Sequence, residues 1–170
     1  HMNAPVSNAP PGRRELRKQE RRKAILQVAR ASFLEHGYAA TSMSGVRDTL
    51  GGSKGTLWGY FRSKEDLFAA VIEDATAQVR ADLSVGMATD GDLVQGLREF
   101  CRSFLRTVES PEGLAVWRLI VAEGSRFPEL GRIFYEQVGR FPEEILTDFL
   151  AKYVGRELRD EDPRRMALML

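Results

Sequence analysis

The chain has 170 residues, of which 43% are apolar, and its 25 Lys/Arg and 24 Asp/Glu give a formal net charge of +1. This length suffices for one good hydrophobic core or two small ones, and no apolar run approaches the roughly 18 residues that a membrane span needs. Cys101 is the single cysteine and His36 the one histidine beyond the first residue. An intramolecular disulfide is therefore excluded, and transition-metal chemistry nearly so.

The charge is distributed unevenly along the chain. Residues 1–64 hold 12 Lys/Arg and 4 Asp/Glu, a net charge of +8, whereas residues 65–170 hold 13 and 20, a net charge of −7. A basic segment joined to an acidic remainder is typical of a nucleic-acid-binding unit on a separate body, because neutralisation of phosphates drives affinity. For any single run of charge, a solvated helix face is the alternative.

The first helix is predicted over residues 13–36, after a 12-residue stretch that is typical of a tag scar (His1-Met2) and a disordered lead-in. Apolar residues recur at helical spacing up to Phe33, and Gly37 follows as a stop signal. Cations before that stripe suit a phosphate backbone or a minor groove. A membrane-surface helix is disfavoured, since Leu16 is their only sizeable apolar neighbour. The cations are Arg13, Arg14, Arg17, Lys18, Arg21, Arg22 and Lys23.

Two short helices joined by a glycine turn are predicted at the end of the basic segment. An amphipathic stretch at residues 43–50 is followed by Gly51-Gly52, then by Ser53 and a second stretch at residues 54–61. Glycine reverses the chain without a Cβ clash, and serine caps the next helix by accepting from its unpaired N–H groups. This is the pattern of a helix-turn-helix, whose second helix points its first turn into the major groove of DNA.

The residues expected to meet DNA lie around that second helix. Its first turn supplies a cation, a residue without a side chain and a hydroxyl, which suit phosphates and base edges. Two aromatic side chains with one polar atom each follow, and hydroxyls at the start of the preceding helix could cap it, hold a phosphate, or both. The candidate DNA-binding residues are Thr41, Ser42, Ser53, Lys54, Gly55, Thr56, Trp58, Tyr60 and Lys64.

This part of the chain resembles the TetR family of bacterial transcriptional regulators. The resemblance rests on IL-x-x-A-x-x-x-F-x-x-x-G-Y at residues 25–38, on TSM at residues 41–43 and on GGSKGTLWGYFRSKEDL at residues 51–67. It implies that residues 53–56 start the recognition helix, that Trp58 contacts a phosphate and that Lys64 clamps the DNA backbone. It also implies a homodimer on an operator and a helical body that commonly holds an effector.

The remaining chain predicts further helices, each with a start signal. A long helix over residues 64–86 is expected to join the head (residues 13–63) to the body (residues 64–170). Later helices start at Asp90 or Asp92, Pro111, Pro128 and Pro163, while Pro142 kinks its helix or starts a new one. The apolar pattern runs to the last residue without a stop signal, so we expect a body truncated at its C-terminal end. In the resembled family the last two long helices pair across a dimer.

Aromatic residues on separate helices of the body indicate a candidate ligand site. Such residues usually fill the core, but helices of a bundle also enclose apolar pockets in which a few polar groups orient a small ligand. Glu123 and Tyr135 are further polar candidates. The candidate ligand-binding residues are Phe100, Phe104, Trp117, Arg118, Phe127 and Phe134.

The sequence therefore predicts an all-α, cytoplasmic DNA-binding regulator with a three-helix head and a helical-bundle body. Its expected partners are a palindromic double-stranded DNA operator, a second copy of the chain and a small apolar effector that releases repression. No Gly-rich phosphate loop, metal-ligand cluster or histidine near a nucleophile is present, so we predict no enzyme, cofactor or metal. The alternative is a small-molecule-binding or protein-interaction module whose helix-turn-helix has lost DNA reading, which the unusual Gly52 and Gly59 make conceivable.

Overall fold

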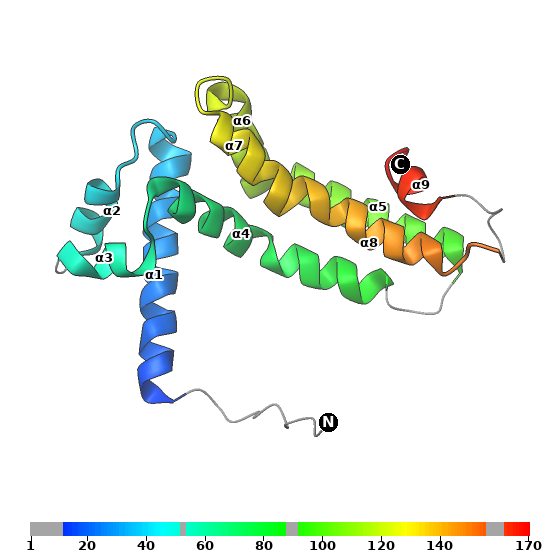
Figure 1. The fold of residues 1–170 in the computed structure, drawn as a ribbon, viewed down its shortest axis with the longest axis horizontal. Helices are drawn as coiled ribbons and strands as arrows, with labels where there is room; N and C mark the ends of the chain where they lie inside the picture. The colour runs from blue at the N-terminus through cyan, green and yellow to red at the C-terminus, as the bar shows by residue number, and fades with distance from the viewer. Residues whose placement is uncertain (1–11, 52–53, 88–91, 156–161) are drawn as a thin grey trace, which may run out of the picture.

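The structure is a computed structural model that describes residues 12–51, 54–87, 92–155 and 162–170. All regular elements in these ranges are helices, which confirms the predicted all-α fold (Figure 1). Helices α1 to α3 gather at one end, and the other helices form an elongated bundle that extends away from them. The elements are α1 (Arg13–His36), α2 (Met43–Leu50), α3 (Lys54–Tyr60), α4 (Lys64–Met87), α5 (Leu93–Glu109), α6 (Pro111–Glu123), α7 (Pro128–Phe134), the π-helix η1 (Tyr135–Gly139), α8 (Arg140–Ala151) and α9 (Pro163–Ala167). The predicted tag scar and nearly all of the predicted lead-in lie outside the described residues.

Serine side chains cap the starts of three helices. Ser42 caps α2 by accepting from the N–H of Gly45 at 3.0 Å, and Ser110 caps α6 by accepting from the N–H of Gly113 at 3.0 Å. Ser63 likewise accepts from the N–H of Asp66 at 3.0 Å at the start of α4. Each cap satisfies a donor that a helix start leaves without an intrahelical partner. The predicted cap at Ser53 lies outside the described residues.

Helix α4 belongs to two hydrophobic cores at once. Its first half buries Leu67, Phe68 and Ile72 in a core shared with the head, and its second half buries Leu83 and Met87 in a core of the body. The first core joins α1, α2 and α3 to residues of α6 and α7, and the second joins α4 to α5, α8 and α9. A displacement of α4 would therefore shift side chains in both cores, because closely packed interiors transmit displacement.

The structure differs from the predicted helix boundaries around residue 135. The sequence predicts one continuous helix up to Phe141, whereas α7 ends at Phe134 and a π-helical turn, η1, precedes α8. Pro142 lies inside the first turn of α8 and has no N–H for the carbonyl of Val138, which weakens the helical ladder there. The guanidinium of Arg80 on α4 donates to the backbone carbonyl and the side-chain oxygen of Gln137, at 3.0 Å to the latter.

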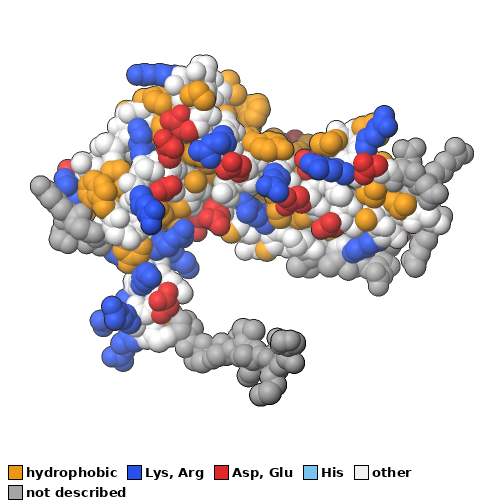
Figure 2. All heavy atoms as spheres, in the orientation of Figure 1, with side chains coloured by type: hydrophobic (Ala, Val, Ile, Leu, Met, Phe, Trp, Pro, Cys, Tyr) orange, Lys and Arg blue, Asp and Glu red, His pale blue; other side chains and the backbone are white. Residues whose placement is uncertain are grey.

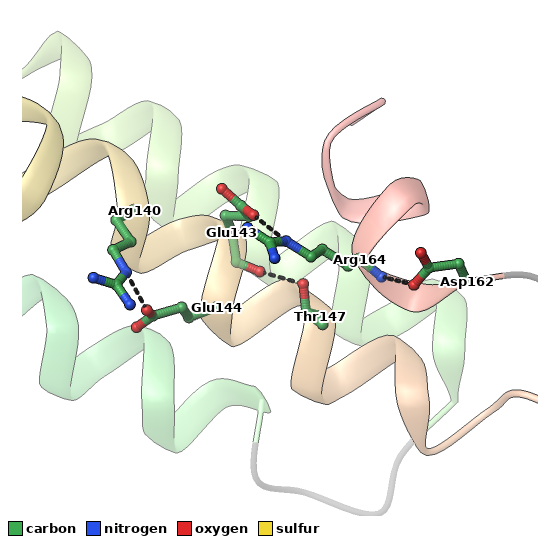
Figure 3. A network of polar contacts seen from close by, with 6 residues as sticks. All are labelled: Arg140, Glu143, Glu144, Thr147, Asp162 and Arg164. Carbon is green, nitrogen blue, oxygen red and sulfur yellow. Dashed lines mark hydrogen bonds and ion pairs between the residues drawn. The ribbon is translucent and has the colours of Figure 1, made fainter.

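Helix α9 is fastened to α8 by polar contacts that Figure 3 shows. The guanidinium of Arg164 donates to a carboxylate oxygen of Glu143 at 3.0 Å, and Asp162 caps α9 by accepting from the N–H of Arg164 at 3.0 Å. The hydroxyl of Thr147 donates to the carbonyl of Glu143 one turn along α8. Ala167 is buried against the core of the body. The last helix of the described chain is thus short but anchored.

Candidate functional sites

The helix-turn-helix is formed by α2 and α3 beside the middle of α1 (Figure 1). Val46 of α2 and Leu57 of α3 are 2% exposed and pack on the buried face of α1. Gly51 ends α2 with a φ of 68°, a conformation that a Cβ disfavours. The guanidinium of Arg21 on α1 donates to the carbonyl of Gly51 at 3.0 Å. The C-terminal end of α2 is therefore held by a side chain of the predicted basic segment.

The recognition-helix candidate α3 has one buried face and one exposed face. Leu57 is buried, and Phe61 directly after the helix is 5% exposed, whereas Trp58 is 40% exposed. The ring of Trp58 lies 5.7 Å from the guanidinium of Arg47 on α2, and Arg47 donates to Asp48 at 2.7 Å. Trp58 is thus displayed at the surface beside a cation. The side chains of Ser53, Lys54, Gly55 and Thr56 lie outside the described residues, so their predicted DNA contacts stay predictions.

Three of the predicted DNA-binding side chains face the protein in this structure. The hydroxyl of Thr41, which is 2% exposed, donates to the carbonyl of Gly37 at 2.9 Å and lies 2.9 Å from the hydroxyl of Ser32. It therefore holds the turn before α2, and Ser42 rather than Thr41 is the cap. Tyr60 is half-buried against the core shared with the head. The predicted phosphate contacts of these side chains would need them to turn outward.

The predicted clamp Lys64 is the third of these side chains. Its ammonium donates to the carbonyl of Tyr38 at 2.9 Å and lies 4.3 Å from the centre of the Tyr38 ring. A cation over an aromatic face is attracted by the ring quadrupole. Lys64 therefore sits between the turn after α1 and the start of α4, and a contact with DNA would require it to leave Tyr38.

The basic end of α1 projects away from the rest of the protein. Figure 2 shows Lys and Arg side chains gathered on this projecting segment. Residues 12–20 are all exposed, and Ile25 is the first buried residue of α1. Since this end has no core to cover, its cations are presented to solvent. Such an arrangement suits a phosphate backbone beside the helix-turn-helix.

A head–body junction connects the turn after α1 with the end of α6. We use this name for the contacts among Tyr38, Ala39, Lys64, Glu123 and Phe127. The carboxylate of Glu123 accepts from the N–H of Tyr38 at 2.5 Å and from the N–H of Ala39 at 3.0 Å. The rings of Tyr38 and Phe127 meet edge to face with their centres 5.2 Å apart. The junction thus fixes the head to the body through both hydrogen bonds and ring packing.

Tyr38 of the junction has a shifted pKa. It is 2% exposed, and its ring stacks on Phe33 and meets the ring of Phe68 edge to face. Burial, together with the negative charges of Glu129, Glu65 and Glu123, raises the pKa of Tyr38 to about 12. The phenol therefore stays neutral throughout the physiological range.

An open cavity of about 1190 Å³ lies in the body, between α4, α5, α6 and η1. Three of the predicted ligand-binding residues line it, namely Phe104, Trp117 and Phe134. The rings of Trp117 and Phe134 lie 5.9 Å apart at an interplanar angle of 57°. Most of the remaining lining is apolar, with Ile72, Val79 and other residues of α4 on one side. An apolar lining with a few polar groups is typical of small-molecule sites, and the volume lies just above their usual range of about 300–1,000 Å³.

The other predicted ligand-binding residues do not line this cavity, and their contacts with a ligand stay predictions. Phe100 is 8% exposed and packs in the core of the body, where its ring stacks on Phe104 with the centres 6.2 Å apart. Arg118 is exposed, and Phe127 belongs to the head–body junction. Glu123, expected near the ligand, caps the turn after α1 instead. A helix places successive residues on different faces, and the sequence alone does not show which face meets the cavity.

The cavity also contains residues that the sequence did not single out as ligand-binding. Residues 72, 75 and 79 of α4 follow an apolar spacing that equally fits a closed core. Arg30 belongs to α1 and so to the head, yet it lines the cavity of the body. No signal in the sequence links it to helices more than 40 residues away.

Other site types find no support in the described ranges. The described residues contain no cluster of three or more His, Cys, Asp or Glu that could hold a metal ion. None of the described helices is long and apolar enough to span a bilayer. What the residues do assemble is a helix-turn-helix with a projecting basic helix, joined through α4 to a bundle that contains a cavity. These features define the class of helix-turn-helix DNA-binding proteins with a second, cavity-containing domain.

Comparison with known proteins identifies the family within that class. Residues 25–71 match the family model of bacterial regulatory proteins of the tetR family, and residues 95–167 match the C-terminal domain of AefR-like transcriptional repressors. The transcriptional repressor AcnR of Corynebacterium diphtheriae is 37% identical over 145 residues, which cover 84% of this chain and 70% of that protein. The regulator BetI of Rhizobium meliloti is 30% identical over 134 residues, 77% of this chain and 65% of that protein.

Solved structures agree with these relatives. The Flavonoid-responsive Regulator FrrA is 35% identical and superposes with a TM-score of 0.74, over 88% of this chain and 76% of that one. A regulator described as TetR-family from Mesorhizobium loti is 29% identical with a TM-score of 0.72, over 89% and 77%. The chain belongs to the TetR family. It is accordingly a DNA-binding transcriptional regulator and not an enzyme.

Proposed function

We propose that the protein is a homodimeric repressor that binds a palindromic operator and is released when a small ligand occupies the cavity of its body. The observation that carries this proposal is the double role of α4. It packs against α1 in the hydrophobic core that also contains residues of the helix-turn-helix, and it lines the cavity with residues 72–82. A ligand that prefers one position of α4 shifts the population of head orientations. In this proposal residues 13–63 form the DNA-binding head and residues 64–170 the regulatory body, and the protein acts in the cytoplasm on bacterial DNA.

The proposed DNA interface combines sequence reading with backbone contacts. The N-terminal turn of α3 enters the major groove, with Lys54 and Thr56 toward base edges, while Ser42 and Trp58 meet phosphates. The projecting cations of α1 follow the adjacent backbone. Two copies of α3 in a dimer would lie about 34–36 Å apart, or a multiple of that turn spacing, to reach successive major grooves.

Repression and ligand response are supported by what the relatives are. AcnR, 37% identical, is a repressor, and FrrA, 35% identical, is a flavonoid-responsive regulator. The cavity of about 1190 Å³ exceeds the volume of one drug-sized molecule, so it accommodates an apolar ligand of several rings. We therefore retain a small, largely apolar effector for this chain.

The proposed dimer uses the outward faces of α8 and α9. The inward face of α8 is occupied by the core of the body, where Leu146, Phe149 and Leu150 are buried. After α9 the chain exposes Leu168, Met169 and Leu170 at 65%, 70% and 75%. Exposed apolar residues beside a helix pair favour burial against a second copy.

Selection of bound genomic fragments tests the function directly. We expect a footprint with a two-fold symmetric sequence and a strong dependence on salt. Lys54→Ala and Thr56→Ala should change the preferred sequence, whereas Lys64→Ala should weaken binding to all sequences and reduce the slope of log K against log salt by about 1. Unchanged operator affinity in all three variants would refute these residue assignments. A protein that binds ligand tightly but gives no footprint at low salt would be the sequestering module instead.

A further inference from the structure

The charged residues that line the cavity differ in their exposure. They are Arg30 of α1, Asp82 of α4, Arg106 of α5 and Glu112 of α6. Asp82, Arg106 and Glu112 are exposed, and Arg30 alone of the four is half-buried. Solvent screens the three exposed charges, so they discriminate weakly between ligands. Arg30 is the one charged residue of this lining that is partly withdrawn from water.

Arg30 also lacks a counter-charge. Among the residues that the structure describes, no carboxylate lies within ion-pair distance of its guanidinium and no hydrogen bond engages it. Asp82, the carboxylate of α4 in the same lining, accepts instead from the amide of Gln78 at 2.9 Å. A partly desolvated cation without a partner is unfavourable, and an anion with two acceptor oxygens relieves it through paired hydrogen bonds.

The rest of the lining sets the shape of what this cation can hold. The rings of Phe104, Trp117 and Phe134 and the apolar side chains of α4 form the walls. Trp117 is 53% exposed, which leaves one side of its ring open to a stacking partner. An anion alone would not cover these walls, and a purely apolar molecule would leave Arg30 unpaired.

We propose that the effector is an aromatic molecule with one anionic group, and that Arg30 is the residue that recognises the anion. This inference rests on the proposed function and refines its apolar effector to an amphipathic one. Planar oxyanions such as carboxylates match the fork of a guanidinium best, and a sulfonate offers the same paired acceptors. The aromatic part lies against Trp117 and Phe134.

The place of Arg30 on α1 gives the same contact a regulatory consequence. Ala29 and Phe33, its neighbours on α1, are buried in the core of the head at 0% and 1% exposure. A ligand held by Arg30 and by Trp117 of α6 therefore bridges the head and the body. Because such a ligand binds more tightly to the orientation in which both contacts are made, it biases the head toward that orientation.

A matched pair of fluorescent probes tests the recognition of the anion. 1-Anilinonaphthalene-8-sulfonate carries a sulfonate, and N-phenyl-1-naphthylamine has the same rings without it. The full chain with Trp58→Phe leaves Trp117 as the remaining tryptophan, since the chain has two. Quenching of its emission therefore reports each probe within energy-transfer range of the cavity, and the Arg30 variants assign the anion contact. We expect Arg30→Gln to lower the affinity for the sulfonate probe about tenfold to a hundredfold. The affinity for the neutral probe should fall less than about twofold.

Two further arginine variants serve as controls. Arg106→Gln removes an exposed arginine of the same lining and should change neither affinity by more than about twofold. Arg30→Lys keeps the charge but loses the paired geometry, and should restore part of the lost affinity. Retained binding of the neutral probe shows that each variant is folded.

The inference is overturned if Arg30→Gln weakens both probes equally, if Arg106→Gln has the larger effect on the sulfonate probe, or if that probe does not quench Trp117. An operator footprint of the wild-type protein, measured in parallel, separates this failure from failure of the proposed function. If the wild type gives a footprint but the affinity for the sulfonate probe does not depend on Arg30, the anion site alone is rejected. Dependence on Arg30 without a footprint supports the anion site and rejects the repressor.

Discussion

Replacing Glu123 by glutamine tests whether the head–body junction holds the two parts of the molecule together. The Glu123 carboxylate accepts two backbone N–H groups, from Tyr38 at 2.5 Å and from Ala39 at 3.0 Å. Glutamine has one acceptor oxygen, so its amide N–H₂ would face one of these donors. Hydrogen bonds to a charged group contribute about 1.5–3 kcal/mol each, and the bond to exposed Ala39 contributes less because water replaces it.

We therefore expect Glu123→Gln to lower the free energy of unfolding by about 1–2 kcal/mol, and Glu123→Ala by about 2–4 kcal/mol. For a chain of this size, each kcal/mol lowers Tm by about 2–4 °C. Urea and thermal unfolding, followed by circular dichroism, measure both quantities. Glu136→Gln is the matched control, because Glu136 forms an exposed ion pair with Arg132, four residues before it. This substitution should lower the free energy of unfolding by less than about 1 kcal/mol.

The same variant has a functional consequence. Helix α6 carries Trp117 at the cavity and Glu123 at its last residue, so displacement of α6 by a ligand reaches the turn after α1 through Glu123. Glu123→Gln should therefore keep operator binding but reduce the effect of ligand on it. Equal stability losses in the Glu123 and Glu136 variants, together with an undiminished ligand effect, would refute this account of the junction.

Other substitutions test packing, titration and DNA contact. Gly96→Ala should lower the free energy of unfolding by about 1–3 kcal/mol, because a Cβ at this position would lie 2.2 Å from the ring of Phe149. A Cβ at Gly131 would meet no atom within 4 Å, so Gly131→Ala should raise it by about 0.5–1 kcal/mol. Urea unfolding measures both changes. The pKa of Tyr38 in the folded state, about 12, exceeds the ordinary tyrosine value of 10.0. The stability of the wild type relative to Tyr38→Phe should therefore fall between pH 10 and 12, and the difference should be constant below pH 10. Trp58→Ala should weaken operator binding about tenfold in fluorescence anisotropy, while stability changes by less than about 0.5 kcal/mol because the ring is exposed.

Local signals in the sequence predicted the elements but not the contacts between them. The caps at Ser42, Ser63 and Ser110 were predictable because a cap depends on residues within one helical turn. The π-helical turn was missed although Pro142, which lacks the N–H that the carbonyl of Val138 would accept, is visible in the sequence. The contact of Arg80 with Gln137 in this turn joins residues 57 apart and gives no local signal. The partnership of Glu123 with Tyr38 spans 85 residues and was equally out of reach.

The candidate sites show the same division between local and distant information. The helix-turn-helix was predictable because its turn chemistry and charge are contiguous in the sequence. For the cavity, aromatic residues on separate helices were the available signal, and only Phe104, Trp117 and Phe134 of the predicted set line it. Which face of a body helix meets the cavity depends on how α4, α5 and α6 pack, and an apolar stripe has the same spacing in a closed core and in a cavity wall.

The position of Lys64 links DNA contact to the head–body junction. Its ammonium already donates to the carbonyl of Tyr38 at 2.9 Å and faces the Tyr38 ring. A phosphate that takes this ammonium replaces a hydrogen bond and a cation–π contact, each on the order of 1 kcal/mol, and so gains less than it would from a solvated lysine. Lys64→Ala should thus lower both the free energy of unfolding and the affinity for every DNA sequence. If unfolding measurements show the loss of stability while the salt dependence of DNA binding is unchanged, Lys64 is a junction residue and the phosphate contact belongs to its neighbours on α3.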